Sequence, residues 1–163
     1  MKRNIVRAAF FAMLLHSLAA VAQAQGHVIC TPAMVAGSWA YTETGTLYVP
    51  TGPVPIAIVG SYTIDANGTL QGARTSSVGG TIATATIKGT ATLNSDCTGT
   101  LELSFYSQGQ LVNTAEKNVV YLNYATEARA IITSVHLPNG TSLPAVMTTD
   151  AKKLFPGTQQ NQQ

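Results

Sequence analysis

Apolar and polar residues alternate along most of this chain after residue 24. Leu101, Leu103 and Phe105, for example, are every second residue of one segment. A period of two places alternate side chains on opposite faces of an extended strand, whereas a helix shows apolar spacings of three and four residues. No segment after residue 24 sustains that helical spacing. The alternation therefore predicts an all-β fold.

Turn signals divide the alternating segments. The strongest is Asp65-Ala66-Asn67-Gly68, because Asn-Gly tolerates the positive φ of tight hairpins. The irregular connection around Pro53 and Pro55 is the longest. Between the turns we expect about eight strands, drawn from residues 37–48, 56–65, 69–78, 81–93, 100–106, 110–114, 118–124, 128–136 and 143–149.

Short connections between successive strands predict a single antiparallel meander. A meander of this size removes its exposed edges most completely by closing into a barrel. The expected fold is therefore a roughly eight-stranded, calycin-like barrel. A β-sandwich is the alternative, because periodicity does not separate the two.

The first 24 residues are typical of an export signal. Three basic residues lie within the first seven positions, an apolar run covers 8–20, and Ala22-Gln23-Ala24 supplies the small residues that signal peptidase requires. We therefore predict cleavage after Ala24 and a periplasmic or secreted protein. The apolar run is too short to span a bilayer, so no membrane insertion is expected.

The predicted organisation follows from this leader. We expect a signal peptide at 1–24, an N-terminal segment at 25–36, a β-barrel domain at 37–150 and a polar, disordered tail at 151–163. The chain has two cysteines, Cys30 and Cys97. In an oxidising compartment such a pair is most simply a disulfide.

Charge and motif content exclude several functions. Nine Lys and Arg oppose seven Asp and Glu, and three of the nine basic residues belong to the leader, so the processed chain has a net charge of −1. Without a basic cluster, nucleic acid is not an expected partner. No metal-ligand spacing, phosphate-binding loop or Gly-x-Ser-x-Gly motif occurs. We therefore assign no catalytic residue, metal or cofactor, and favour a non-enzymatic role.

Charged residues on apolar faces are the candidate site. Glu43 shares a strand face with Tyr41, and Arg74 shares a strand face with Leu70 and Val78. If both point inward, Arg74 would anchor a ligand carboxylate while Tyr41 or Tyr62 donates a hydrogen bond. The alternative, which the sequence favours, is a structural Glu43–Arg74 pair or side chains that reach solvent at a barrel mouth.

The segment from Met34 to Tyr41 contains Gly-Ser-Trp and resembles the first strand of lipocalins and other calycins. The resemblance implies that Trp39 lies across the closed end of a barrel with an arginine packed over it, and Arg129 is the candidate. Segments 65–69 and 94–101 resemble small exported bacterial proteins of uncharacterised function that are similar to the allene oxide cyclase barrel.

By analogy of architecture, the leading hypothesis is binding of a small hydrophobic ligand inside the barrel. One alternative is a structural or surface-interaction module with a filled core. Another is a cyclase- or isomerase-like enzyme whose barrel positions a flexible substrate. The sequence does not specify protein partners.

Overall fold

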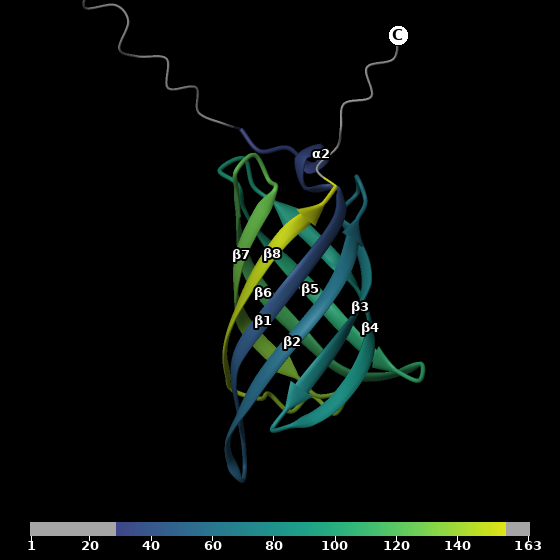
Figure 1. The fold of residues 1–163 in the computed structure, drawn as a ribbon, viewed down its shortest axis with the longest axis vertical. Coiled ribbons are helices and arrows are strands. Elements are labelled where there is room, and N and C mark those ends of the chain that lie inside the picture. The colour runs from purple at the N-terminus through teal and green to yellow at the C-terminus, as the bar shows by residue number, and fades with distance from the viewer. Residues whose placement is uncertain (1–28, 156–163) are drawn as a thin grey trace, which may run out of the picture.

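The computed structural model describes residues 29–155, which form a closed antiparallel barrel (Figure 1). Each strand pairs with the next, and β8 pairs with β1, so the barrel prediction is confirmed over the sandwich. The elements are α2 (Pro32–Val35), β1 (Gly37–Val49), β2 (Gly52–Ile64), β3 (Thr69–Val78), β4 (Thr81–Leu93), β5 (Thr98–Ser107), β6 (Gln110–Leu122), β7 (Glu127–His136) and β8 (Ala145–Leu154).

Alternating burial confirms that the period of two defines an inner and an outer face. In β5, Leu101, Leu103 and Phe105 are buried, and in β1 the buried residues include Trp39 and Tyr41. Outward positions of β4 are largely threonine, which favours extended backbone and tolerates water. The core therefore lies inside the barrel.

The hairpin turns follow local side-chain chemistry. Oδ1 of Asp65 accepts hydrogen bonds from the backbone N–H groups of Asn67 and Thr69, both at 2.8 Å. Gly68 completes the turn at φ +83°, a conformation that favours glycine. The predicted Asn-Gly turn thus joins β2 to β3.

Some predicted boundaries require correction. The segment with Pro53 and Pro55 is strand rather than irregular loop, because these residues pair only with β1, and pairing with β3 begins at Ile56. A strand edge without a neighbour tolerates residues that lack an N–H donor. Residues 110–114 and 118–124 belong largely to one strand, β6. β8 continues to Leu154, so the barrel takes in the first residues assigned to the tail.

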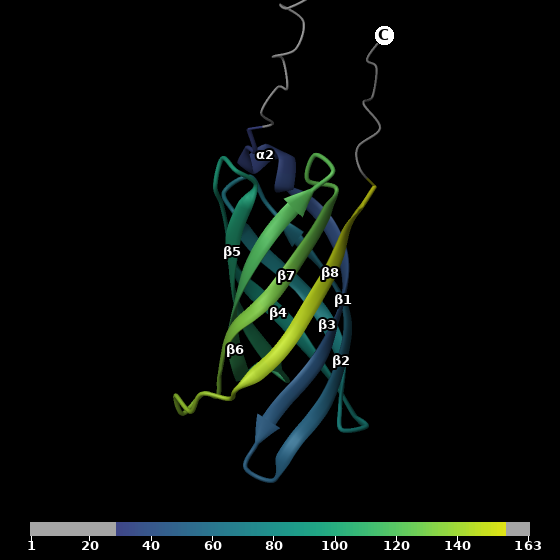
Figure 2. The ribbon, with the colours of Figure 1, turned by 90° about the vertical axis from the view of Figure 1, so that its left-hand side faces the viewer.

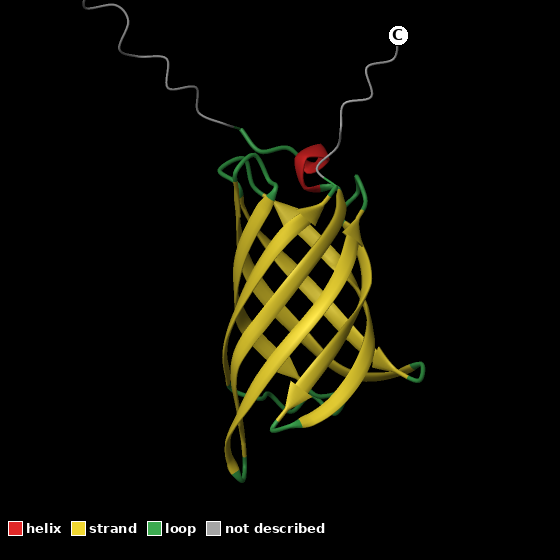
Figure 3. Cartoon of the chain, in the orientation of Figure 1, coloured by secondary structure: helices red, strands yellow, loops and turns green. Residues whose placement is uncertain are grey.

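Residues 29–36 lie at one end of the barrel, where α2 lies over the strand termini (Figures 1 and 3). This four-residue helix was not expected from the sequence. The predicted disulfide between Cys30 and Cys97 is confirmed. The indole Nε1 of Trp39 donates a hydrogen bond of 2.9 Å to the carbonyl oxygen of Val35, which fixes α2 to the core. The predicted signal peptide and its cleavage site lie outside the described residues.

The cation over Trp39 is Lys153, not Arg129. Nζ of Lys153 lies 5.8 Å from the centre of the indole ring and donates to the carbonyl oxygen of Met34 at 2.8 Å. Arg129 is on the outer face and pairs with Asp150 at 2.7 Å. Its neighbours along β7, Ala128 and Ala130, are the inward residues, so alternation turns Arg129 outward.

Candidate functional site

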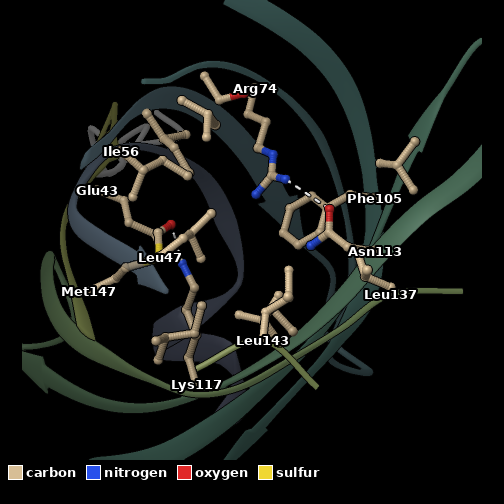
Figure 4. Close-up of a pocket in the computed structure, with 17 residues that line it drawn as sticks. Glu43, Leu47, Ile56, Arg74, Phe105, Asn113, Lys117, Leu137, Leu143 and Met147 are labelled. Atoms are coloured by element: carbon tan, nitrogen blue, oxygen red, sulfur yellow. Dashed lines mark hydrogen bonds and ion pairs between the residues drawn. The ribbon is translucent and has the colours of Figure 1, made fainter. Parts of the chain in front are cut away.

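The barrel interior divides into two halves of different packing. The half beside α2, which we call the filled half, leaves a space of only about 10 Å³. The opposite half, which we call the open half, contains a cavity of about 200 Å³ (Figure 4). Figure 2 shows that α2 and the β7–β8 connection lie at opposite ends of the barrel. Leu137 and Leu143 from that connection line the cavity, which places it away from α2.

Aromatic side chains occupy the filled half. Trp39 stacks on Tyr62 with ring centres 6.5 Å apart and meets the ring of Tyr121 edge-on at 5.8 Å. Tyr41 lies 5.5 Å from Tyr62. Burial raises the pKa of Tyr41 and of Tyr62, so both hydroxyls stay protonated.

The structure therefore separates the predicted site residues. Tyr41 and Tyr62 line the small space of the filled half, while Glu43 and Arg74 line the cavity. Tyr41 and Glu43 share the inner face of β1 but lie at successive inward positions. Sequence parity identifies the face, and the position along the barrel axis decides which space a side chain reaches.

Glu43 forms a buried ion pair with Lys117. Oε2 of Glu43 accepts from Nζ of Lys117 at 2.6 Å, and the side chains are 2% and 4% exposed. Nζ of Lys117 also donates to Oγ1 of Thr149 at 3.0 Å. The expected Glu43–Arg74 pair is therefore replaced by a Glu43–Lys117 pair, while burial lowers the pKa of Lys117 and the carboxylate opposes that shift.

Sequence reasoning missed Lys117, although the signal was present. Lys117 shares parity with Ala115, Val119 and Tyr121, all of which are buried on β6. Splitting this strand at residues 114 and 118 assigned Lys117 to a connection. If the period-two alternation is continued across Glu116 and Lys117 as one strand, Lys117 falls on the inner face.

Arg74 is the second cation of the cavity. Its Nη2 donates to Oδ1 of Asn113 at 3.2 Å, and its guanidinium carbon lies 3.4 Å from the centre of the Phe105 ring. Burial lowers the pKa of Arg74, and the negative charge of the Glu43 carboxylate opposes that shift. Within residues 29–155, no carboxylate forms an ion pair with Arg74, and its buried Nε has no hydrogen-bond partner.

Apart from Glu43, Lys117, Arg74, Asn113 and Ser76, the cavity wall is apolar. Apolar side chains from seven strands contribute to it, including Leu47, Ile56, Phe105, Val135 and Met147. Figure 4 shows Arg74 and Glu43 reaching into the same lumen from different parts of the wall. Lys117 and Arg74 bring two positive charges, and Glu43 brings one negative charge, so the wall carries a net positive charge.

Two further findings concern metal binding and membrane-spanning helices. Across residues 29–155, no group of three or more His, Cys, Asp and Glu side chains is placed to hold a metal ion. None of the helices in that range is long and apolar enough to cross a membrane.

Comparisons with known proteins show the fold alone. No protein-family model matches the sequence, and no match to a curated protein was found. The structure described as EF1p2_mFAP2b bound to DFHBI aligns with a TM-score of 0.53 and 12% identity, covering 75% of this chain and 95% of that one. The redesigned β-barrel mFAP1 bound to DFHBI gives a TM-score of 0.49 and 18% identity over 76% and 98% of the chains.

A third similar structure is a lyase. The S-type phycobiliprotein lyase CPES from Guillardia theta aligns with a TM-score of 0.42 and 8% identity over 76% of this chain and 90% of its own. At 12% identity, the likeness to the EF1p2_mFAP2b structure extends to the fold and not to site residues.

Proposed function

We propose that this protein binds a small, mostly apolar molecule with an anionic group inside the open half of the barrel, with Arg74 as the anchor. The observation that carries the proposal is a mostly apolar cavity of about 200 Å³ whose wall includes the half-buried guanidinium of Arg74, which has a buried Nε and no carboxylate partner within residues 29–155. A buried cation is costly unless it is paired, and a ligand anion would supply the pair.

The size and lining of the cavity support a small ligand. Pockets for drug-sized molecules span roughly 300–1,000 Å³ and combine apolar walls with a few polar groups. This cavity is smaller, at about 200 Å³, and has the same kind of lining. A ligand of about the size of one substituted ring fits these dimensions. The structure with a TM-score of 0.53 was solved bound to DFHBI, which supports small-molecule binding by this fold by analogy.

The arrangement at Arg74 favours a planar anion. A guanidinium presents donors in a fixed plane that matches carboxylate oxygens, and it accepts nothing. The Phe105 ring fixes that plane from one side, and Asn113 occupies one terminal nitrogen. A carboxylate is therefore the anion that we expect.

Fewer observations support the two alternative functions, a structural module and an enzyme. A structural module with a filled core requires an interior without a cavity, and the open half does not meet that condition. The cyclase- or isomerase-like enzyme remains a prediction, to be tested by loss of turnover when Glu43 or Arg74 is replaced by Ala. We also propose that the protein works in an oxidising compartment, where the Cys30–Cys97 disulfide is stable.

The test compares benzoate with benzyl alcohol and benzylamine, which share a ring and differ in charge. Isothermal titration calorimetry on the disulfide-bonded protein should give the tightest binding for benzoate. Arg74→Gln should weaken benzoate binding by roughly ten- to a hundredfold, the range for a hydrogen bond to a charged group.

Arg129→Gln is the matched control, because Arg129 lies on the outer face and is 48% exposed. It should leave benzoate binding unchanged. Equal binding of all three probes, or equal loss in both arginine variants, would overturn Arg74 as the anchor. Absence of binding by every probe at millimolar concentration would overturn the proposed function.

A further inference from the structure

We propose that the ligand is a hydroxy acid, with a hydroxyl group that donates a hydrogen bond to Oε1 of Glu43 while its carboxylate meets Arg74. The inference rests on the proposed function and adds a second point of recognition. The observation behind it is a buried acceptor without a partner, on the wall of the same cavity.

Glu43 has one occupied and one free oxygen. Oε2 accepts from Lys117, whereas Oε1 is buried and has no hydrogen-bond partner. The side chain of Glu43 is 2% exposed. Buried polar atoms in folded proteins are almost always hydrogen-bonded, so an orphaned carboxylate oxygen on a residue that lines a cavity indicates a missing partner.

The ion pair determines what that partner must be. A carboxylate paired with an ammonium group only accepts hydrogen bonds, so the missing group is a donor. An amine in its cationic form is disfavoured, because Lys117 and Arg74 already supply two positive charges against one carboxylate. A neutral hydroxyl satisfies Oε1 without adding charge.

Arg74 imposes the opposite requirement at the other end of the ligand. A guanidinium only donates, and Nε of Arg74 has no partner. The two sites therefore require one donor and one anionic acceptor on a single molecule. A ligand with a carboxylate alone would leave Oε1 of Glu43 unsatisfied.

The barrel register shows that one small molecule can reach both groups. Glu43 lies opposite Ile58 of β2, and Arg74 lies opposite Gly60 of the same strand. The two residues are thus two strands apart and offset by one inward position. Two strand spacings are about 10 Å, and both side chains extend into the lumen and shorten the gap. Figure 4 shows this convergence.

The test uses ligands that are matched in shape. The probes are 3- and 4-(hydroxymethyl)benzoate, with 3- and 4-ethylbenzoate as isosteres that lack the hydroxyl. In the wild-type protein, at least one hydroxymethyl isomer should bind roughly tenfold or more tightly than its ethyl counterpart.

A double variant identifies the residue responsible. Glu43→Leu with Lys117→Met removes both charges together, so that no buried ion is left unpaired. In this variant the hydroxyl preference should disappear while the preference for benzoate over benzyl alcohol remains. Arg74→Gln should show the reverse pattern, with loss of the carboxylate preference and retention of the hydroxyl preference.

The outcomes separate the two proposals. Equal affinity of hydroxymethyl and ethyl probes in the wild-type protein would overturn the hydroxy-acid inference, because an ordered water would then be the partner of Oε1. The proposed function would survive that result if binding still depends on Arg74. A hydroxyl preference that persists in the double variant would also overturn the role of Glu43. If no carboxylate probe binds, both proposals fail.

Discussion

Inward and outward residues alternate along the strands in both halves of this barrel, but the two halves differ in how their interiors are packed. In the filled half, inward positions carry Trp39, Tyr62 and Tyr121, whose rings contact one another. In the open half, Phe105 is the one aromatic residue that lines the cavity, and Oε1 of Glu43 and Nε of Arg74 have no hydrogen-bond partner within residues 29–155. The difference indicates that side-chain volume, not strand pairing, decides where a β-barrel has a core and where it has a site.

The boundary between the filled half and the open half is closely packed around Gly60. A methyl group at Gly60 would lie 2.7 Å from Cε1 of Tyr41 and 2.6 Å from the carbonyl oxygen of Ala73. Only glycine allows the tyrosine ring to lie against β2 at this point. The cavity begins at the next inward positions, where Glu43 and Ile58 line it.

The largest expected effect is at the boundary between the halves, where Lys117 contacts both spaces. Lys117→Met should lower the free energy of unfolding by about 3–5 kcal/mol, because Glu43 becomes a buried charge without a partner. Adding Glu43→Leu should restore most of the loss. Urea denaturation at neutral pH measures both variants.

Lys152→Met is the matched control, since Lys152 is 73% exposed and lies 3.9 Å from Glu127. It should change stability by less than about 1 kcal/mol. If the single and double variants at the buried pair lose the same stability, the pair does not behave as a coupled unit.

Leucine truncation compares the packing of the halves directly. Leu70 is 1% exposed in the filled half, and Leu47 is half-buried on the cavity wall. Leu70→Ala should cost about 3 kcal/mol, because it creates a cavity in a close-packed core. Leu47→Ala should cost about 1 kcal/mol, because fewer contacts are lost. Equal costs from urea denaturation would show that the open half is packed as tightly as the filled half.

Enlarging an alanine makes the complementary comparison. Ala130 lines the 10 Å³ space and Ala115 lines the 200 Å³ cavity. Ala130→Leu should lose about 1–3 kcal/mol of stability through overpacking. Ala115→Leu should lose less than about 1 kcal/mol and should weaken benzoate binding, because it fills ligand space. A reversed order of the two thermal midpoints would contradict the division into halves.

The sequence predicted the fold well because the signals are local. Alternation specifies which face of a strand is buried, and turn residues specify where strands reverse, so barrel, meander and disulfide were accessible from residues 25–163. Position along the barrel axis is not local. It depends on the register of neighbouring strands, and this is why Tyr62 is expected to share a ligand site with Arg74 but lies beside Trp39.

The candidate site was predictable in part. Glu43 and Arg74 were found because each interrupts an apolar face. The partner of Glu43 was missed because two adjacent charged residues on β6 resemble a strand end. Arg129 is placed over Trp39 only by the resemblance to calycins, which implies an arginine from a late strand, yet it lies on the outer face with Ile131, which has the same parity and is 51% exposed. The sequence does not distinguish an apolar residue on the outer face from one on the inner face.

The smallest expected effect concerns a hydroxyl group in the filled half. The hydroxyl of Tyr121 is buried without a hydrogen-bond partner, and burial raises its pKa from 10.0 to about 12. Tyr121→Phe should be neutral or stabilising by up to about 1 kcal/mol at neutral pH, because it removes an unsatisfied polar atom.

The variant should also change the response to alkali. Below the unfolded-state pKa of 10.0, Tyr121 is protonated in both states, so it adds no pH dependence. As pH rises from there through about 12, the unfolded chain loses its proton first, and the wild-type protein loses stability. Tyr121→Phe should therefore show a shallower alkaline loss in urea denaturation, with a residual slope from Tyr41 and Tyr62, whose pKa values burial also raises. Identical slopes in the two proteins, together with lower stability of the variant at neutral pH, would show that an ordered water satisfies the Tyr121 hydroxyl. The filled half would then be wetter than its aromatic packing indicates, and the contrast with the open half would be one of degree.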